Sequence, residues 1–409
     1  MNYLVAKINK ILAFIVIIFI FNACNNKKGG ETSKEINYEV KSVIDSSSIM
    51  KSKEVSYDTL LTGIADFIGG IKISKKLSNI EIDSIFWNNL KKETDKNFNK
   101  TSETRLTNIS NWNINDFIGN NSDSLTVFYP FSGPDFLHVN YLYPNTKTFV
   151  LLAIEKIGNI PDFETKGARF TEKYLKDINN FMRDIYLRGY FITSHMKTDL
   201  KETSNNGLLG SLYWFISRTE HKIINQEFIT LDENGRIIKE NSINEGWLES
   251  QYDGVSFKLL DKNGKEKKLI YFSGDISNKG LTKKNPELKT YLNNLGQVNT
   301  FVKAASYLMH YNSFDQIRNI VLDKSYSVFQ DDTGVPYRFY KPETFDVSLF
   351  GRYRDPIKDF ASTMDIITQE GLRQDYKKKD LNKGSLPFSL GYHYRNRKNQ
   401  NQQLAVKKN

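Results

Sequence analysis

Apolar residues recur at helical spacing near the start of the folded region. In the stretch YDTLLTGIADFIGGI, the leucine, isoleucine and phenylalanine side chains stand three or four positions apart, and Gly69-Gly70 follows the last of them. This spacing places them on one face of a helix, and glycine is common just after a helix end. The same criterion predicts further helices over residues 80–106, 134–143, 170–187, 208–216, 286–294 and 299–311.

Alternating or continuous apolar runs predict strands elsewhere. SLTVFYP is a short run of this kind, and TFVLLAIEK, residues 148–156, is almost continuously apolar, as is typical of a strand buried on both faces. The runs KIINQEFITL, GVSFKLLD and KKLIYFSGD predict an antiparallel meander, because Asn-Gly at positions 234–235 and 263–264 favours tight turns. Shorter strands are predicted near residues 325–329, 345–350 and 388–394.

The order of these elements indicates the fold class. Strands and helices are interspersed without an internal repeat, and no Pro- or Gly-rich segment divides the chain into two folded parts. Hydrophobic residues make up 39% of the 409 positions, which is sufficient for a large core. We therefore predict an α+β (mixed α/β) fold, a single large domain over residues 56–395 with a mostly antiparallel sheet flanked by helices.

The first residues form a separate pattern. Lys7 and Lys10 precede the unbroken apolar run ILAFIVIIFIF at residues 11–21, which is shorter than the roughly 20 residues of a membrane-spanning helix. A run of this length is typical of the apolar core of a signal peptide. The following Ala23-Cys24 resembles the lipobox of bacterial lipoproteins, whose cysteine becomes lipidated and N-terminal. The resemblance implies a signal peptide over residues 1–23 and a lipid anchor on Cys24. An ordinary signal peptide with an incidental cysteine is the alternative.

Cysteine usage agrees with this interpretation. Cys24 is the only cysteine, so the exported chain would hold no internal disulfide. Residues 24–55 are polar, which predicts a flexible tether between the anchor and the domain. We expect a bacterial cell-envelope lipoprotein, periplasmic or surface-exposed, whose partner is the membrane that holds its lipid.

The formal net charge is +10, and positive residues gather near the C-terminus. We predict a basic, solvated tail over residues 396–409. Positive charge favours nucleic acid, anionic lipid or acidic glycan. No RNA-recognition motif, zinc finger or helix-turn-helix pattern is visible, so nucleic acid is not expected as a partner. Attachment of the tail to anionic lipid or glycan stays open as an alternative.

The stretch FYPFSGPDFLHV carries the first candidate site residues, Ser132 and Asp135. Their spacing fits a capping box, in which Ser132 accepts a hydrogen bond from a first-turn amide and Asp135 reaches back to the serine N–H. Pro134 would then lie in the first turn of the helix. The alternative is that the serine or the carboxylate takes part in a functional site at this strand-to-helix turn. The G-x-S-x-G pattern of a nucleophile elbow is absent.

The stretch FVKAASYLMHYNSF carries His310. On the predicted helix, Lys303, Ser306, Tyr307 and His310 share one side, and a lysine or histidine beside a hydroxyl is the minimal arrangement that activates a nucleophile. Ordinary helical amphipathicity explains the same pattern without catalysis. The other four histidines are isolated and none has zinc-ligand spacing, so we expect neither a metal site nor a cofactor.

The stretch VFQDDTGVPYRFY carries Asp331, Asp332 and Arg338. Asp332-Thr333-Gly334 is similar to the D-T-G triplet of aspartic proteases, but that mechanism needs two such carboxylates and the chain has one triplet. A turn after a strand, with an aspartate bonding its own backbone and Gly334 at positive φ, explains the triplet more simply. Carboxylates and an arginine between aromatic rings also suit recognition of a carbohydrate or a peptide.

Taken in order, YPFSGPDF, KAASYLMH, QDDTGVPYRFY, LFGRYRDPIKDF and LPFSLGY resemble a family of uncharacterised bacterial secreted proteins and lipoproteins. The family has no assigned activity, so the resemblance implies export and one long domain but no site residues. We predict a membrane-anchored lipoprotein with a binding or structural role. The alternative is a hydrolase of a glycan or peptide polymer, with Ser132, Asp135, His310, Asp331, Asp332 and Arg338 in one pocket.

Overall fold

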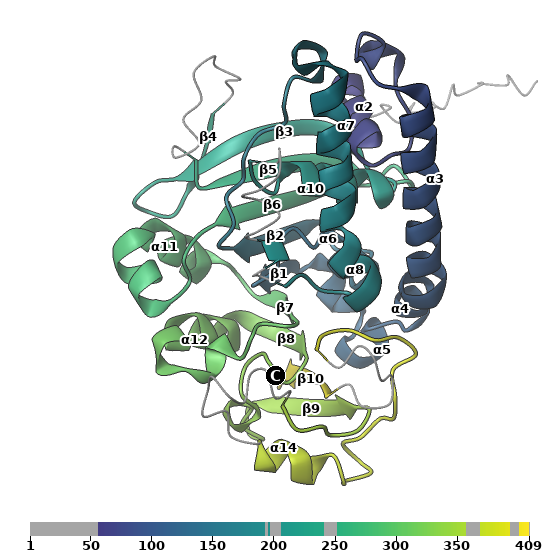
Figure 1. Ribbon diagram of the computed structural model, residues 1–409. Helices are drawn as coiled ribbons and strands as arrows, with labels where there is room; N and C mark the ends of the chain where they lie inside the picture. The colour runs from purple at the N-terminus through teal and green to yellow at the C-terminus, as the bar shows by residue number, and fades with distance from the viewer. Residues whose placement is uncertain are drawn as a thin grey trace, which may run out of the picture. The chain divides into compact units, whose positions relative to one another are not determined.

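A mixed β-sheet forms the centre of the computed structural model (Figure 1). The structure describes residues 56–192, 195–196, 206–240, 252–356, 369–392 and 401–408. Within them the sheet has ten strands in the order β4-β3-β5-β6-β2-β1-β7-β8-β10-β9. Their bounds are β1 Thr126–Pro130, β2 Thr148–Ala153, β3 Lys222–Leu231, β4 Ile237–Glu240, β5 Gly254–Leu260, β6 Glu266–Ser273, β7 Val298–Val302, β8 Ser325–Gln330, β9 Phe345–Phe350 and β10 Gln402–Lys407.

The strands are parallel in the middle of the sheet and antiparallel at both sides. The neighbours from β6 through β2, β1 and β7 to β8 form four parallel pairings. The remaining five pairings are antiparallel. The predicted fold class, a mixed and mostly antiparallel sheet flanked by helices, is therefore confirmed. The parallel centre matters for function, because the carboxyl ends of β1, β7 and β8 meet at one edge of the sheet.

Helices cover both faces of the sheet (Figure 1). One face packs against α2 Thr59–Ile68, α3 Ser84–Thr101, α6 Phe136–Leu142, α7 Phe163–Phe181 and α10 Leu209–Arg218. The other face packs against α11 Pro286–Asn294 and α12 Asp315–Lys324. Shorter helices are α4 Thr107–Asn111, α5 Asn115–Ile118, α8 Arg183–Arg188 and α14 Glu370–Asp375. No helix among the described residues has both the length and the apolar character needed to cross a membrane.

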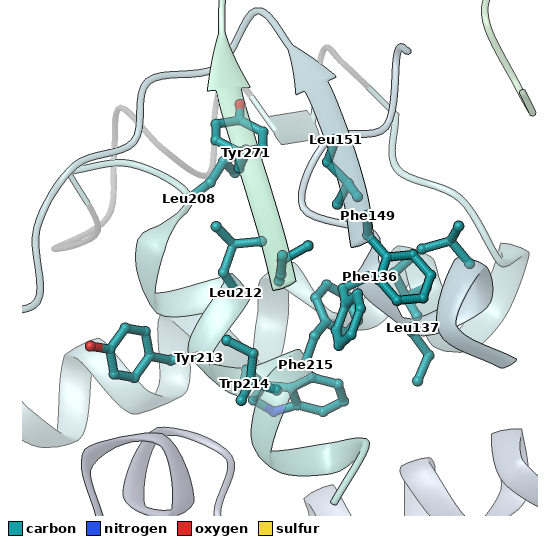
Figure 2. Close-up of a cluster of buried hydrophobic side chains, with 14 of the residues drawn as sticks. Phe136, Leu137, Phe149, Leu151, Leu208, Leu212, Tyr213, Trp214, Phe215 and Tyr271 are labelled. Atoms are coloured by element: carbon teal, nitrogen blue, oxygen red, sulfur yellow. The ribbon is translucent and has the colours of Figure 1, made fainter. Parts of the chain in front are cut away.

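Helix α10 lies in the middle of the larger core. Leu212 and Phe215 of this helix face Phe149 of β2 and Tyr271 of β6, as Figure 2 shows. Every residue of α10 is buried, which explains why its sequence is apolar almost all round. Each large side chain removed from water in this way contributes about 1.5–3 kcal/mol to folding.

The central strands contribute side chains to both cores. On β2, Phe149 and Leu151 lie in the cluster beneath α10, whereas Val150 and Leu152 lie in the cluster beneath α11 and α12. The alternation explains the continuous apolar run at residues 148–156, because both faces of this strand are covered. The prediction of a strand buried on both sides is confirmed here.

Three predictions about secondary-structure elements are wrong in the described residues. The predicted helix over 299–311 begins instead with strand β7, which five buried residues form. The residues 388–392 of the predicted strand near 388–394 have no strand conformation. The predicted solvated tail over 396–409 contains β10, which lies between β8 and β9, so this segment is part of the sheet. The predicted signal peptide, the tether and Cys24 lie outside the described residues.

Candidate functional site

The three stretches that carry the candidate residues meet at the carboxyl edge of the parallel strands. Ser132 and Asp135 follow β1, His310 follows β7, and Asp331 with Asp332 follows β8 directly. Strands β1, β7 and β8 are neighbours and run in the same direction. Loops at this edge are where open α/β sheets place their ligands. The topology therefore brings together segments that are far apart in the sequence.

Ser132 is buried and engaged with the end of β2. Its Oγ accepts a hydrogen bond from the Leu152 N–H at 3.1 Å and lies 2.8 Å from the Gly133 carbonyl oxygen, to which it donates. The predicted capping box is wrong in its details, because the N-cap of α6 is Asp135, whose carboxylate accepts from the His138 N–H. The Ser132 hydroxyl forms no bond with His310, so these two residues are not a nucleophile and its base.

Asp135 belongs to a buried group of charged and polar side chains. Its Oδ2 lies 2.6 Å from Lys303 Nζ and accepts a hydrogen bond from the Tyr129 hydroxyl at 3.2 Å. Its Oδ1 lies 2.9 Å from His138 Nδ1, and the lysine ammonium also donates to the Gly189 carbonyl oxygen. Asp135, His138 and Lys303 are at most 3% exposed. A buried ion pair with additional hydrogen bonds of this kind fixes the relative positions of the loops after β1 and β7.

Burial governs the protonation of this group. Burial alone disfavours the charged form of Asp135, but the adjacent His138 and Lys303 outweigh it and hold the pKa of the carboxyl well below its usual range. Burial lowers the pKa of His138 to about 4, so its ring is neutral near pH 7. Burial also lowers the pKa of Lys303, and the Asp135 carboxylate acts in the opposite sense. The group contains a carboxylate, a neutral imidazole and an ammonium, so His138, which has no zinc-ligand spacing in the sequence, belongs to a buried polar group in the fold.

Asp331 is fully buried and holds two loops together. Its Oδ1 accepts from the Thr333 N–H at 3.1 Å and from the Thr333 hydroxyl, and its Oδ2 accepts from the Ala304 N–H at 3.0 Å. The predicted turn is thus present, but Asp331 makes it, and Gly334 is not at positive φ. Glycine is required there because a Cβ at position 334 would lie 2.2 Å from Gln330 Oε1. Burial and then the neighbouring Asp332 charge raise the pKa of Asp331 to about 6.

Asp332 connects the same edge to β10. Its Oδ2 accepts from the Tyr307 hydroxyl at 3.0 Å and from Asn401 Nδ2 at 2.9 Å. Asn401, the residue before β10, also donates to the Arg354 carbonyl oxygen and accepts from the Arg354 N–H. Asp332 therefore fixes the loops that follow β7 and β9 against the start of β10.

His310 and Arg338 lie beside this network. His310 is half-buried at the end of a short 3₁₀ helix, Leu308–His310, and its ring meets that of Tyr307 edge to face at 5.2 Å. Burial lowers its pKa to about 4. Arg338 is exposed, and its guanidinium stacks on Phe339 at 4.8 Å. We predicted that His310 and Lys303 lie on the same side of one helix. The structure has no such helix, because residues 298–302 form strand β7 and only Leu308–His310 form a short 3₁₀ helix.

A small cavity of about 60 Å³ opens at this edge. It is lined by aromatic rings together with polar groups from the loops after β1 and β7; the residues concerned include Tyr129, Phe131, Tyr190, Lys303 and Ser306. Of the six candidate residues, only Ser132 and Asp135 line it. Its volume suits a few water molecules or one small substituent of a larger ligand.

Backbone conformations that L-residues rarely adopt gather at this edge, at three residues of the cavity lining and at two residues that bond Asp332. Phe131, Ala304, Ser306 and Tyr307 have φ between 51° and 60°, and Asn401 has φ 48°. Among the described residues only Glu220 is a further non-glycine residue of this kind, at the turn before β3. Each left-handed residue costs about 1–2 kcal/mol, and such residues are enriched at functional sites. This concentration marks the edge as the candidate site.

Sequence reasoning missed several residues of this site. His138 stands three positions after Asp135, a spacing that places the two together at a helix N-terminus, so this pair was detectable. Asn401 was assigned to the tail and gave no signal. Within the described residues no three His, Cys, Asp or Glu side chains come together as metal ligands do.

Comparison of the chain with protein-family models, with curated proteins and with solved structures finds no match. The resemblance to uncharacterised secreted proteins and lipoproteins therefore stays a prediction.

Proposed function

We propose that this chain is a cell-envelope lipoprotein whose folded unit binds a glycan or peptide polymer at the carboxyl edge of β1, β7 and β8. The observation that carries the proposal is that Phe131, Ala304 and Ser306, which line the 60 Å³ cavity at that edge, all have left-handed backbone conformations. Such backbone persists only where surrounding contacts hold it, and a ligand site is the usual reason to retain it.

The lining of the cavity supports recognition of a polymer substituent. Ser306 is half-buried, and its Oγ lies 2.7 Å from the Tyr392 hydroxyl. Tyr190 and Tyr392 pack edge to face at 5.1 Å beside it. Aromatic rings with hydroxyl groups at their edges stack on sugar rings or apolar side chains and bond polar substituents. The cavity would take one substituent, and the remainder of the polymer would lie over the surrounding loops.

Binding is favoured over catalysis because the polar groups are already engaged. Ser132 bonds the end of β2, Asp135 pairs with Lys303, and Asp331 accepts three hydrogen bonds. None of the three is left as a base or nucleophile without breaking a structural contact. One observation favours the hydrolase alternative, namely that the pKa of Asp331 is raised to about 6. A carboxyl with such a pKa is suited to proton transfer near neutral pH.

The experiment is cosedimentation of the purified full-length chain, held in detergent micelles, with insoluble peptidoglycan, which contains both a glycan and a peptide. Two variants form a matched pair. Ser306→Ala and Ser306→Leu both lose the bond to Tyr392, but only the leucine side chain fills the cavity. We expect Ser306→Ala to sediment almost as the unmodified chain does, and Ser306→Leu to stay in the supernatant.

The same mixture also tests the alternative. If soluble saccharide or peptide fragments accumulate and Asp331→Asn abolishes their release, the hydrolase hypothesis replaces the binding role. Equal sedimentation of both Ser306 variants, with folding confirmed by circular dichroism, would contradict the assignment of the cavity.

A further inference from the structure

The charged groups that line the 60 Å³ cavity leave no net charge in it. Among the described residues of the lining, only Asp135 and Lys303 are charged, and their side chains lie 2.6 Å apart. Both are buried. A charged substituent that entered the cavity would lose its water without meeting an unpaired charge of opposite sign, which is unfavourable. The cavity therefore favours a neutral substituent.

Apolar side chains form one wall of the cavity. Met196 and Phe191 lie against Gly133, because a Cβ on this glycine would lie 3.5 Å from the Met196 sulfur and 3.4 Å from the Phe191 ring. Leu308 adds a further apolar side chain to the lining. A hydroxyl placed against such a wall loses its hydrogen bonds to water and finds no partner, whereas a methyl group is stabilised there. The substituent that fits therefore has an apolar end.

Ser306 offers a hydrogen-bond acceptor to the cavity. Its Oγ lies 2.7 Å from the Tyr392 hydroxyl, which donates its single proton to the Ala304 carbonyl oxygen at 3.3 Å. Ser306 is therefore the donor to Tyr392, and in agreement burial raises the pKa of Tyr392 while the Ser306 hydrogen bonds lower it. No described residue donates to the Ser306 Oγ. Its lone pairs are thus available to an N–H or O–H of a ligand.

Gly133 offers a hydrogen-bond donor. This glycine lines the cavity with backbone atoms alone, and its N–H forms no hydrogen bond with any described residue. Its carbonyl oxygen already accepts from the Ser132 hydroxyl. Gly133 is buried, and buried backbone N–H groups nearly always have an acceptor. A carbonyl oxygen of a ligand would fill that role.

We propose that the cavity takes the acetamido group of an N-acetylated glycan, an inference that rests on the binding role proposed above. The group is neutral, its N–H donates to the Ser306 Oγ, and its carbonyl oxygen accepts from the Gly133 N–H. Its methyl group packs against Met196 and Phe191. A sugar hydroxyl has no apolar end for that wall. A peptide chain continues on both sides of each amide, whereas an acetamido group ends in its methyl and therefore suits a hollow of this small volume.

The test is calorimetric titration of the full-length chain, held in zwitterionic detergent micelles, with trisaccharides that share one backbone. Triacetylchitotriose, deacetylated chitotriose and cellotriose carry an acetamido, an amino and a hydroxyl group at the same carbon of each sugar. We expect the acetylated sugar to bind at least about tenfold more tightly than either of the others. Its affinity should change by less than about twofold between roughly 0.05 M and 0.5 M salt. Equal binding of cellotriose or of the deacetylated sugar, or no binding of any trisaccharide, would overturn the proposal.

Variants of Ser306 locate the site. Ser306→Leu fills the cavity and should abolish binding of triacetylchitotriose. Ser306→Ala removes only the acceptor and should weaken binding by about fivefold, a loss that sedimentation with excess peptidoglycan does not register. Ser78→Leu makes the same change at an exposed serine outside the lining and should have no effect. Unchanged binding in Ser306→Leu, with folding confirmed by circular dichroism, would overturn the proposal.

Variants of Met196 test the apolar wall. Met196→Leu and Met196→Gln both keep a side chain of similar size, but only glutamine places an amide where the ligand methyl packs. We expect Met196→Gln to weaken binding of triacetylchitotriose by at least about threefold and Met196→Leu to change it by less than about twofold. Equal affinity of the two variants would contradict the placement of the methyl group against this wall.

The outcomes also separate this inference from the proposed function. A chain that sediments with peptidoglycan and binds trialanine, but not triacetylchitotriose, has a peptide as its ligand; this result overturns the inference and leaves the binding role standing. A chain that neither sediments nor binds a trisaccharide contradicts both. Binding of triacetylchitotriose that Ser306→Leu abolishes, without sedimentation, supports the acetamido site and contradicts the assignment of a polymer.

Discussion

Lys303 places a single ammonium group between the loops after β1 and β7. It is 3% exposed and lies 2.6 Å from the Asp135 carboxylate. Replacing it by methionine, Lys303→Met, keeps the length of the side chain but leaves Asp135 buried without its cation. Because removing one partner of a buried ion pair typically costs about 3–5 kcal/mol, we expect a loss of this size in the free energy of unfolding, measured by urea denaturation.

Two control variants show whether the loss of stability in Lys303→Met comes from breaking the buried ion pair. Lys173→Met removes a lysine that pairs with Asp177 at 2.7 Å on an exposed helix surface, and should cost less than about 1 kcal/mol. The double variant Asp135→Asn with Lys303→Met removes both charges and should be more stable than the sum of the single variants indicates. If the two single losses simply add, the pair does not act as a unit.

His310 should make stability depend on pH. Its pKa falls from 6.5 to about 4 on folding, so the unfolded chain binds a proton in this window and the folded chain does not. Stability is therefore complete above pH 6.5 and is lost as the pH falls toward 4. His310→Gln should reduce this slope by up to about 1.4 kcal/mol per pH unit, measured by urea unfolding across the window.

Other titratable residues also make the free energy of unfolding depend on pH. Burial lowers the pKa of His138 and of His221 to about 4, so both act in the same direction as His310. Asp331 acts in the opposite direction, because its raised pKa of about 6 makes stability fall as the pH rises from its ordinary pKa of 3.8. His310→Gln should remove one contribution and leave the others. An unchanged slope would mean that His310 is already protonated or exposed in the folded chain.

At the scale of elements, β10 completes the sheet from the end of the chain. It pairs with both β8 and β9, and Leu404 and Ala405 have no exposed surface. Truncating the leucine, Leu404→Ala, should lower the free energy of unfolding by about 2–5 kcal/mol, because it leaves a cavity between packed layers. Val406→Ala, on the same strand but half-buried, should cost distinctly less. Equal and small losses in both variants would indicate that β10 is not held in the sheet.

The sequence predicted well those elements in which the spacing of apolar residues reflects which face of the element is buried. Helix α2 has one apolar face, and the hairpin between β5 and β6 turns at Asn263-Gly264. Strand β7 was mistaken for a helix because both of its faces are buried, which removes the period-two signal. Its polar members Asn299 and Thr300 are satisfied by bonds to β8 and neighbouring loops, and no local pattern reveals such partners.

The same limit applies to the candidate site. Ser132, Asp135 and the Asp331-Asp332 pair were identified because carboxylates and hydroxyls at strand ends are locally recognisable. Their actual partners are Leu152, Lys303 and Asn401, which the parallel order of β2, β1, β7 and β8 and the late insertion of β10 bring close. Strand order depends on long-range pairing, so the network could not be predicted from spacing alone.

At the scale of the whole molecule, the edge of β1, β7 and β8 belongs to one compact unit that runs from Val55 to Asn409. Its cavity is narrow, and the Asp135 carboxylate and the Lys303 ammonium beside it neutralise each other. Binding of a neutral polymer at this edge should therefore change little with salt, because the contact does not rely on unpaired charge.

The proposed anchor belongs to the same scale, since it would hold this unit at a membrane through Cys24. The change is Cys24→Ala, which removes the only thiol that can carry a lipid. A single acyl chain binds membranes only marginally, whereas two or more chains anchor stably. We therefore expect the unmodified chain in the membrane fraction and the variant in the soluble fraction. The variant should also no longer incorporate a labelled fatty acid.

The free energy of unfolding in urea should be the same for both chains, because Cys24 precedes the folded unit in the sequence. Continued membrane association of the variant, without label, would show that residues 11–21 or another surface holds the chain at the membrane.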